Sequence, residues 1–389
     1  IFIIMFSVIS SGMVAVMTQN IGAGRPGVAY QARQLGLAFN AVLGVIMSLF
    51  LSLGAGTILS GVGVADALMQ PAKTYLQIVG GFCILNALIP ICSSYLRAFG
   101  FSKEPLYASI IGNVINFCLN AFFLFVLHKG VAGVATATVI SRIINLVIVV
   151  LLGAVLVKAK QHPERESNRA VMGQIIRIGL PSACETAIYN VSMTLVIRFL
   201  NQMDAQGLNV TARSYTMQIT NFSYCVGAAL AQANAIMTGW HIGAKEYDAC
   251  DRGTKKAAVI GVIVAVILET VFTLCSGWIM QLFSKDPQMV SLVGKLLAID
   301  IVLEIGRVTN LVYGQALKTS GDAVFPVVMG ACFMILCSVG GTYLFGIRLG
   351  LLAVGAYIGM TGDECVRAVG MYLRWKSGKW KEKGLVKSR

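Results

Sequence analysis

Charged residues are scarce in this chain of 389 residues. They make up 12% of the sequence, whereas 57% of it is hydrophobic. Soluble domains carry about 25% charged residues. A water-soluble protein of this length could not bury so much apolar surface, so the composition indicates an integral membrane protein. The alternating ten-residue strands that build a membrane β-barrel are absent from the sequence, which leaves an all-α membrane protein.

The residues of metal and catalytic sites are also few. The three histidines lie at loops or helix ends, and the ten cysteines form no CxxC pair. The short loops lack Ser-His-Asp, metal and phosphate-loop signatures, and no nucleotide-binding domain is present. We therefore expect no cofactor and no metal centre, and neither an enzyme nor an ATP-driven pump. The less favoured alternative is an integral membrane enzyme with its catalytic site at an interface.

The net charge of +14 does not predict a nucleic-acid partner, because the basic residues gather in alternate loops. Cytoplasmic loops of membrane proteins carry this excess of Lys and Arg. The loops around Arg25, Arg97 and Lys245 fall on the basic side together with the C-terminal tail. We therefore expect a multi-pass protein of the cell membrane, namely a bacterial inner membrane, with a cytoplasmic tail.

Apolar segments of sufficient length to span a membrane, roughly 20 residues, recur along the chain. Eleven are predicted, at residues 1–20, 34–58, 72–97, 105–127, 132–157, 174–200, 212–240, 255–279, 290–317, 324–346 and 351–373. The third contains Gly80, Gly81 and Pro90, which predict a deformable helix.

The most polar interior stretch separates two halves that resemble each other. Residues 158–173 begin KAKQHPERESNR and predict a solvated cytoplasmic linker. A shift of 221 positions places Ile21-Gly22-Ala23 on Ile242-Gly243-Ala244, and Pro105 on Pro326. We therefore predict an N-terminal bundle at 1–157, a C-terminal bundle at 174–373 and a basic tail at 374–389.

The repeat also explains the odd number of spans. The segment 174–200 has no partner in the first half, because its equivalent would precede residue 1. We therefore expect a first helix that this chain lacks, and twelve helices in two homologous six-helix bundles. Halves of equal orientation are related by a pseudo-two-fold axis along the membrane normal.

An ordered set of motifs resembles the multidrug and toxic compound extrusion (MATE) family over nearly the whole chain. The set comprises residues 18–24 (TQNIGAG), 130–138 (GVAGVATAT), 179–181 (GLP), 304–310 (EIGRVTN), 317–322 (LKTSGD), and Asp363-Glu364 with Arg367 and Arg374-Trp375. The resemblance implies a V-shaped fold of two lobes around a central cavity, with access that alternates between the two sides of the membrane.

The resemblance further implies export of organic, often cationic, small molecules in exchange for H⁺ or Na⁺. We expect a monomer that contacts membrane lipid and a small-molecule organic substrate, with no nucleic-acid partner. The family's functional Asp on the first helix is absent here, Asn116 and Asn120 stand in the fifth-helix region where several members have Asp, and Arg307 stands where one branch has Asp. A flippase for lipid-linked oligosaccharides is the alternative within transport.

Every acid within a predicted span lies in the second half. A charged side chain at mid-bilayer costs about 3–17 kcal/mol, so such residues face a cavity or a partner. Asp300, Glu304, Arg307 and Asn310 follow one side of the helix 290–317. A structural charge-pair network of Arg307 with Asp363, Glu364 and Arg367 is one interpretation, and a cavity lining that binds the coupling cation is the other.

Glu185 has no basic neighbour on its own helix and follows Pro181 by one turn. It is predicted to bind the coupling cation together with Asp300 and Glu304, although pairing with an arginine across the bundle is an equal alternative. Glu269 lies in an otherwise apolar helix, which favours a structural or lipid-edge role. The predicted substrate cavity comprises Tyr215, Gln218, Asn221, Asn310, Asn116 and Asn120.

Overall fold

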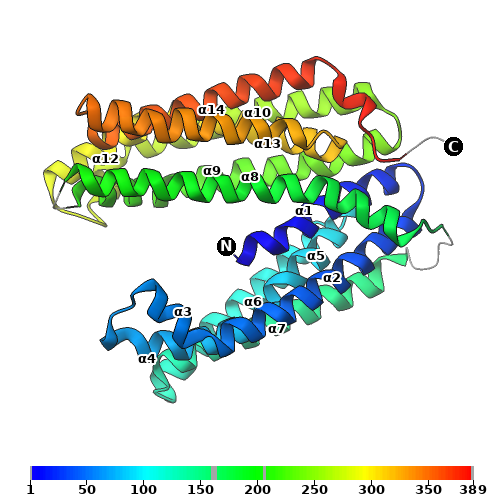
Figure 1. The fold of residues 1–389 in the computed structure, drawn as a ribbon, viewed down its shortest axis with the longest axis horizontal. Coiled ribbons are helices and arrows are strands. Elements are labelled where there is room, and N and C mark those ends of the chain that lie inside the picture. Colours follow the sequence, from blue (N-terminus) through cyan, green and yellow to red (C-terminus); the bar gives the residue numbers. More distant parts are fainter. Residues whose placement is uncertain (1, 159–163, 205–206, 387–389) are drawn as a thin grey trace. The chain divides into compact units, whose positions relative to one another are not determined.

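The computed structural model describes residues 2–158, 164–204 and 207–386 and contains only helices, turns and loops in these ranges (Figure 1). Its contacts divide the chain into two compact units, residues 1–180 and 181–389, and the division falls within one long helix, α8 (Asn168–Met203). The first turns of α8 therefore pack with the first unit, and the rest of it packs with the second.

In the described residues, the first unit contains seven α-helices besides the start of α8, together with two short π-helical stretches. They are α1 (Phe2–Gly22), α2 (Pro26–Leu53), α3 (Ala55–Val62), α4 (Asp66–Tyr75), η1 (Leu76–Gly80), α5 (Ile84–Ala98), α6 (Lys103–Ala121), η2 (Phe122–Val126) and α7 (Gly130–Leu156). Glycines allow α1 to cross α8 closely. A methyl group at Gly12 would lie 1.9 Å from the carbonyl oxygen of Ile175.

The second unit is built around a single 34-residue helix, α12 (Pro287–Ser320), which packs against α9, α10 and α14. The other elements are α9 (Leu208–Gly243), α10 (Tyr247–Leu274), α11 (Ser276–Met280), α13 (Val324–Phe333), η4 (Met334–Val339), η5 (Thr342–Arg348), α14 (Leu352–Lys376) and η6 (Lys379–Glu382). Leu296, Leu297 and Leu303 of α12 are fully buried, so this helix forms the centre of the core.

The helix bounds confirm the repeat at an offset of 221 residues. α2 begins at residue 26 and ends at 53, and α10 begins at 247 and ends at 274. α6 begins at 103 and α13 at 324. Gly100 and Gly321, which differ by the same offset, both have positive φ angles of 89° and 99° after a helix end. Glycine adopts this conformation without the steric cost that a Cβ would bring.

One pair of equivalent helices differs between the halves. The second half has the continuous α12, whereas residues 66–98 of the first half form α4, η1 and α5, with a 42° bend between Gly80 and Ile84. The glycines at 80 and 81 lie at this bend, whereas Pro90 lies within the continuous helix α5.

Among the residues that the structure describes, five helices are long and apolar enough to cross a membrane, or six if the bent pair is one span. They overlap the predicted spans 34–58, 105–127, 132–157, 255–279 and 324–346, and the bent pair overlaps 72–97. The five other predicted spans are also helical, as α1, α8, α9, α12 and α14. These five helices contain more polar residues. Most residues of the site described below lie on them.

The linker and the tail contact the helices more than the sequence indicates. Glu166 of the linker forms an ion pair with Arg25 at 2.6 Å, and Gln31 donates to its carbonyl oxygen at 2.7 Å. In the tail, Trp380 stacks on Trp375 with ring centroids 4.1 Å apart, and both are buried. Residues 159–163 of the linker and 387–389 of the tail lie outside the described residues.

Candidate functional site

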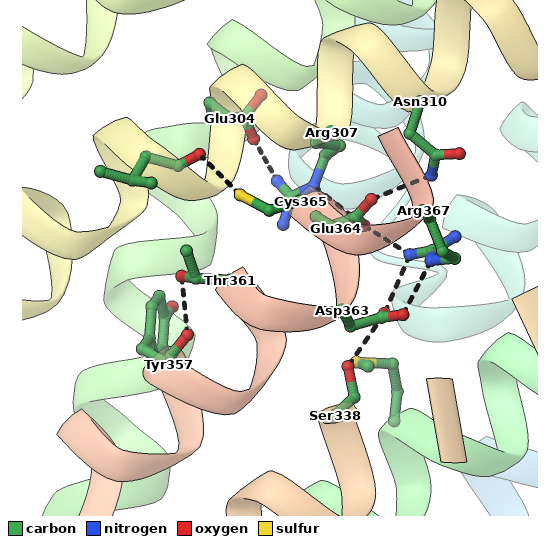
Figure 2. Close-up of polar contacts among 12 residues, drawn as sticks. Glu304, Arg307, Asn310, Ser338, Tyr357, Thr361, Asp363, Glu364, Cys365 and Arg367 are labelled. Atoms are coloured by element: carbon green, nitrogen blue, oxygen red, sulfur yellow. Dashed lines mark hydrogen bonds and ion pairs between the residues drawn. The ribbon is translucent and has the colours of Figure 1, made fainter. Parts of the chain in front are cut away.

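A network of buried charges joins α12 to α14 (Figure 2). Arg307 donates to Oε1 of Glu304 on its own helix, and its Nε lies 3.8 Å from Oε1 of Glu364 on α14. Nη2 of Arg367 lies 2.9 Å from the same Glu364 oxygen. Asn310 donates to the other oxygen of Glu364 at 3.0 Å. The predicted pairing of Glu304 with Arg307 and of Glu364 with Arg367 is confirmed.

The network continues from Arg367 to Asp363 and then to η4. Nε and Nη2 of Arg367 donate to the two carboxylate oxygens of Asp363 at 2.8 and 2.9 Å, which is the bidentate geometry of strong Arg–carboxylate pairs. Ser338 of η4 donates to Asp363 at 3.0 Å. Arg367 is 3% exposed, so its charge is compensated by these two acids rather than by water.

Gly306 explains why the two helices approach so closely at this point. A methyl group on Gly306 would lie 2.8 Å from the backbone nitrogen of Cys365 and 2.9 Å from the carbonyl carbon of Glu364. The absent side chain therefore lets the α12 backbone contact the α14 backbone between the two charged pairs. This close contact brings Arg307 within reach of Glu364.

A cavity of about 230 Å³ lies beside the network, within the second unit. Charged side chains on its wall are Asp300, Arg307, Asp363, Glu364 and Arg213. Three tyrosines and three methionines also line it, namely Tyr189, Tyr224, Tyr357, Met193, Met217 and Met360. The cavity therefore offers carboxylates and aromatic faces, which attract organic cations, together with soft side chains that adapt to different shapes.

The structure places Glu185 in an ion pair. Its Oε2 lies 2.5 Å from Nζ of Lys318, and the two side chains are 15% and 14% exposed. The expectation of an unpaired carboxyl is therefore wrong, and so is an arginine as its partner. The predicted span 290–317 stops one residue before Lys318, but Lys318 lies in the last turn of α12 and pairs with α8. α8 runs helically through Pro181.

Glu269 is completely buried, so a lipid-edge role is wrong for it. One ligand atom each from Glu269, Asp300 and Glu304 can be chosen so that all lie within 4.8 Å of one another. Asp300 and Glu304 are 2% and 0% exposed. α10 and α12 thus bring together three acids, of which the sequence analysis had grouped only the two on α12.

The residues of the predicted substrate cavity lie in several places. Asn221 lines the charged cavity, and with Gln218 it lines a second, mostly apolar pocket of about 670 Å³. Tyr215 packs its ring on Phe283, with centroids 5.3 Å apart. Asn310 binds Glu364 as described above.

Asn116 and Asn120 belong to the first unit. Asn120 donates to Asn116 at 3.0 Å, and Asn116 donates to Ser141 at 3.3 Å.

The sequence analysis missed Arg213 and the three cavity tyrosines. Arg213 falls at the start of the predicted span 212–240 and was not named as a candidate residue, but it lies in the second turn of α9 and is 6% exposed. Tyr189 on α8 follows Glu185 by four residues and is a helical neighbour of it. From that spacing, Tyr189 could have been predicted as a residue of the candidate site. Tyr357 precedes Thr361 by four residues and lies on the cavity wall with Asp363, but it was not named as a candidate residue.

Comparison with known proteins agrees with this architecture. The MatE family model matches residues 1–122 and 181–344. An uncharacterized transporter of Bacillus subtilis (strain 168), YisQ, is 32% identical over 390 residues that cover 99% of this chain and 85% of the relative. The probable multidrug resistance protein NorM of Thermotoga maritima is 22% identical and is matched over 97% of this chain and 82% of its own length.

Solved structures show the same fold. A MATE crystal structure in the bent conformation superposes with a TM-score of 0.89 at 18% identity, over 98% of this chain and 85% of the other. The eukaryotic MATE transporter AtDTX14 gives a TM-score of 0.85 over the same share of each chain. The chain therefore belongs to the MatE family, and it is a membrane-embedded transporter rather than an enzyme.

Proposed function

We propose that this protein exports organic cations by antiport with H⁺ or Na⁺, and that access to its cavity alternates as the two lobes rearrange. The observation that carries the proposal is the cavity of the second unit, whose wall combines Asp300, Asp363 and Glu364 with three tyrosines. The positive charge on the same wall is neutralised in part, because one of its arginines, Arg307, is paired with Glu304. An organic cation gains from the carboxylates and from the aromatic faces together.

Antiport requires that the ion and the substrate disfavour each other's binding, which is a coupling free energy between two sites. Asp300 and Glu304 are the acids best placed for this role. Asp300 lines the cavity, and Oδ2 of Asp300 and Oε2 of Glu304 are buried without a hydrogen-bond partner. Cation binding at these acids removes negative charge from the cavity wall, which weakens the attraction for a cationic substrate.

Glu185 takes part in coupling only if Lys318 releases it, because the ion pair already neutralises its charge. Its carboxylate also lies against α13, where a methyl group on Gly330 would be 3.7 Å from Oε1 of Glu185. We therefore retain Glu185 as a coupling residue of lower rank than Asp300 and Glu304.

The test is uptake of a fluorescent cationic dye into inverted membrane vesicles, whose cytoplasmic face is turned outward. A proton gradient and a sodium gradient are applied in turn, and an anionic dye serves as the comparison. We expect gradient-driven movement of the cationic dye alone. Glu185→Gln and Asp300→Asn are measured in the same assay, and the stronger loss is expected for Asp300→Asn. Transport of the anionic dye only would refute the proposed substrate class, and dye movement without either gradient would refute antiport.

A further inference from the structure

Arg213 of α9 carries a buried positive charge. The residue is 6% exposed, and its Nε has no hydrogen-bond partner. Its Nη2 lies 3.6 Å from Sδ of Met193, which is an uncharged atom. Arg213 forms no ion pair with any acid among the residues that the structure describes. Burial of a charge is strongly disfavoured unless an opposite charge compensates it, so the fold leaves a place here for an anionic group.

The membrane surface does not explain this arginine. Long basic side chains near helix ends commonly extend toward the membrane interface and keep their charge in water. Arg198, near the end of α8, is exposed as this role requires. Arg213 lies in the second turn of α9, but it lines the charged cavity of the second unit. Its charge is therefore available to a molecule in the cavity.

Arg213 and Glu364 lie at different levels of the cavity wall. The side chain of Asn209 accepts from the backbone N–H of Ala353, so the first turns of α9 and α14 are adjacent. Four residues further along each helix, Arg213 and Tyr357 lie within electrostatic range of each other. Glu364 follows Tyr357 by seven residues. At about 1.5 Å per residue, this separation along α14 is roughly 10 Å, which one small organic molecule can span.

Acidic groups accompany the other positions on the wall. Tyr224, eleven residues after Arg213 on α9, lies within electrostatic range of Glu364. Asp300 lies within electrostatic range of Tyr357 but forms no ion pair with Arg213 in the described residues. The cavity thus presents an unpaired positive charge at its Arg213 end and carboxylates along the rest of its wall.

We propose that Arg213 determines substrate specificity by binding an anionic group, such as a carboxylate, of an organic molecule whose cationic group lies against the acids of the cavity. The preferred substrate is then a zwitterion. A guanidinium holds a carboxylate through two parallel N–H···O bonds, and Nε of Arg213 is free to donate one of them. This role rests on the proposed function, because it adds an anionic group to the organic cation that the acids attract.

Discrimination between substrates follows from the cost of leaving Arg213 unpaired. A cation that lacks the anionic group displaces water from the cavity but gives the guanidinium no partner. A site built to pair with a substrate group rejects the analogue without that group more strongly than a site shaped by packing alone does. Loss of a hydrogen bond to a charged group corresponds to a factor of about 10 or more in affinity.

The test compares two dyes that differ at one carboxyl group. Rhodamine B is a zwitterion at neutral pH, and rhodamine B ethyl ester carries the same aromatic cation with the carboxylate blocked. Fluorescence anisotropy measures the affinity of each dye for the purified protein in phosphatidylcholine nanodiscs, and protein-free nanodiscs correct for binding to lipid. We expect the parent to bind rhodamine B at least about tenfold more tightly than the ester. Equal affinities, or tighter binding of the ester, overturn the proposal.

Arg213→Gln removes the charge and keeps a polar side chain. We expect the affinity for rhodamine B to fall at least about tenfold and the affinity for the ester to stay unchanged. Arg213→Lys keeps the charge without the planar fork of donors, so it should restore part of the preference. Arg198→Gln, at an exposed position of α8, is the matched control and should leave both affinities unchanged. A preference for rhodamine B that persists in Arg213→Gln overturns the proposal.

A purely structural role of Arg213 would affect both dyes alike, so equal weakening of the two affinities contradicts the proposal. Arg213→Met provides the same comparison if Arg213→Gln does not elute as a folded protein in size-exclusion chromatography. The two proposals fail separately. A missing preference for rhodamine B, with the ester still bound, refutes the role of Arg213 and leaves export of organic cations intact. Tight binding of the ester without its gradient-driven uptake into vesicles refutes antiport alone.

Discussion

Arg307 has contacts on both sides of the α12–α14 interface. It is paired with Glu304 on its own helix and lies 3.8 Å from Glu364 on the other. Its side chain is 22% exposed, while those of Glu304 and Glu364 are 0% and 10% exposed. The acids therefore depend on this guanidinium more than on water for compensation of their charge.

Replacement of Arg307 by Ala should lower the free energy of unfolding by about 3–5 kcal/mol, because it leaves buried acids without their cation. Arg307→Lys keeps the charge but loses the planar donor geometry, so we expect a smaller loss. Thermal unfolding in detergent measures both. A melting temperature of Arg307→Ala equal to that of the parent would show that Glu304 is held by other groups.

The sequence indicated which residues carry charge but not which charges meet. Pairs three or four residues apart on one helix, such as Glu304 and Arg307, could be predicted because the helical repeat fixes their distance. The pairing of Glu185 with Lys318 and the approach of Glu269 to Asp300 depend on how α8 and α10 pack against α12. Helix periodicity carries no information on that packing, so the sequence left Glu185 either unpaired or paired with an arginine, and it favoured a structural or lipid-edge role for Glu269.

Close contact between α12 and α14 depends on the small size of one residue. We expect Gly306→Val to destabilise the second unit by about 1–3 kcal/mol, as overpacking in a filled core does. The added atoms would meet the backbone of Glu364 and Cys365, which cannot move aside as a side chain does. Arg307 would then lie farther from Glu364, so transport should fall as well.

Gly294 on the same helix is the matched control for this prediction. A methyl group there would lie 3.4 Å from Oγ of Ser276, an ordinary contact distance. Gly294→Ala should be neutral or stabilising by up to about 1 kcal/mol, because Ala has the higher helix propensity. If Gly306→Val and Gly294→Ala unfold at the same temperature, a larger side chain at position 306 does not push α12 away from α14.

The start of α9 is stabilised by Asp204 in the preceding loop. Its Oδ1 accepts from the backbone N–H of Leu208 at 2.9 Å, and its Oδ2 accepts from the N–H of Asn209 at 3.0 Å. Partial burial raises the pKa of Asp204, but the hydrogen bonds from Asn209, Leu208 and Gly207 outweigh it, so the pKa lies below its ordinary value. Asn209 in turn accepts from the N–H of Ala353 at the start of α14.

We expect Asp204→Ala to cost about 1 kcal/mol at neutral pH, as the loss of a helix cap does. Because the folded-state pKa is depressed, the stabilisation by Asp204 is present above the unfolded-state pKa of about 3.9. It is lost as the pH falls through the lower folded-state value. The gap in melting temperature between parent and variant should therefore narrow below about pH 4. A constant gap across the acid range would contradict the ionised cap.

At the scale of the whole molecule, the sequence predicted the internal repeat and the helical character of all eleven apolar segments. A hydropathy pattern that recurs after 221 residues survives the divergence of individual side chains, because each helix must still begin and end at the membrane surfaces. The bend at Gly81 followed from its glycines. The position of Lys318 within a helix was missed, because predicted boundaries are uncertain by several residues.

The charged core of the second unit has a surplus of acids. Glu269, Asp300, Glu304, Asp363 and Glu364 are five carboxylates, and Arg307 and Arg367 are the two arginines that pair with members of this group. An electric field across a membrane acts on every fixed or bound charge that moves through it, with about 2.3 kcal/mol per elementary charge for each 100 mV. For a carrier that works as proposed, the surplus determines the sign of the charge on the loaded and unloaded forms. The membrane voltage, and not the ion concentrations alone, would then set how fast each form of the carrier changes its access from one side of the membrane to the other.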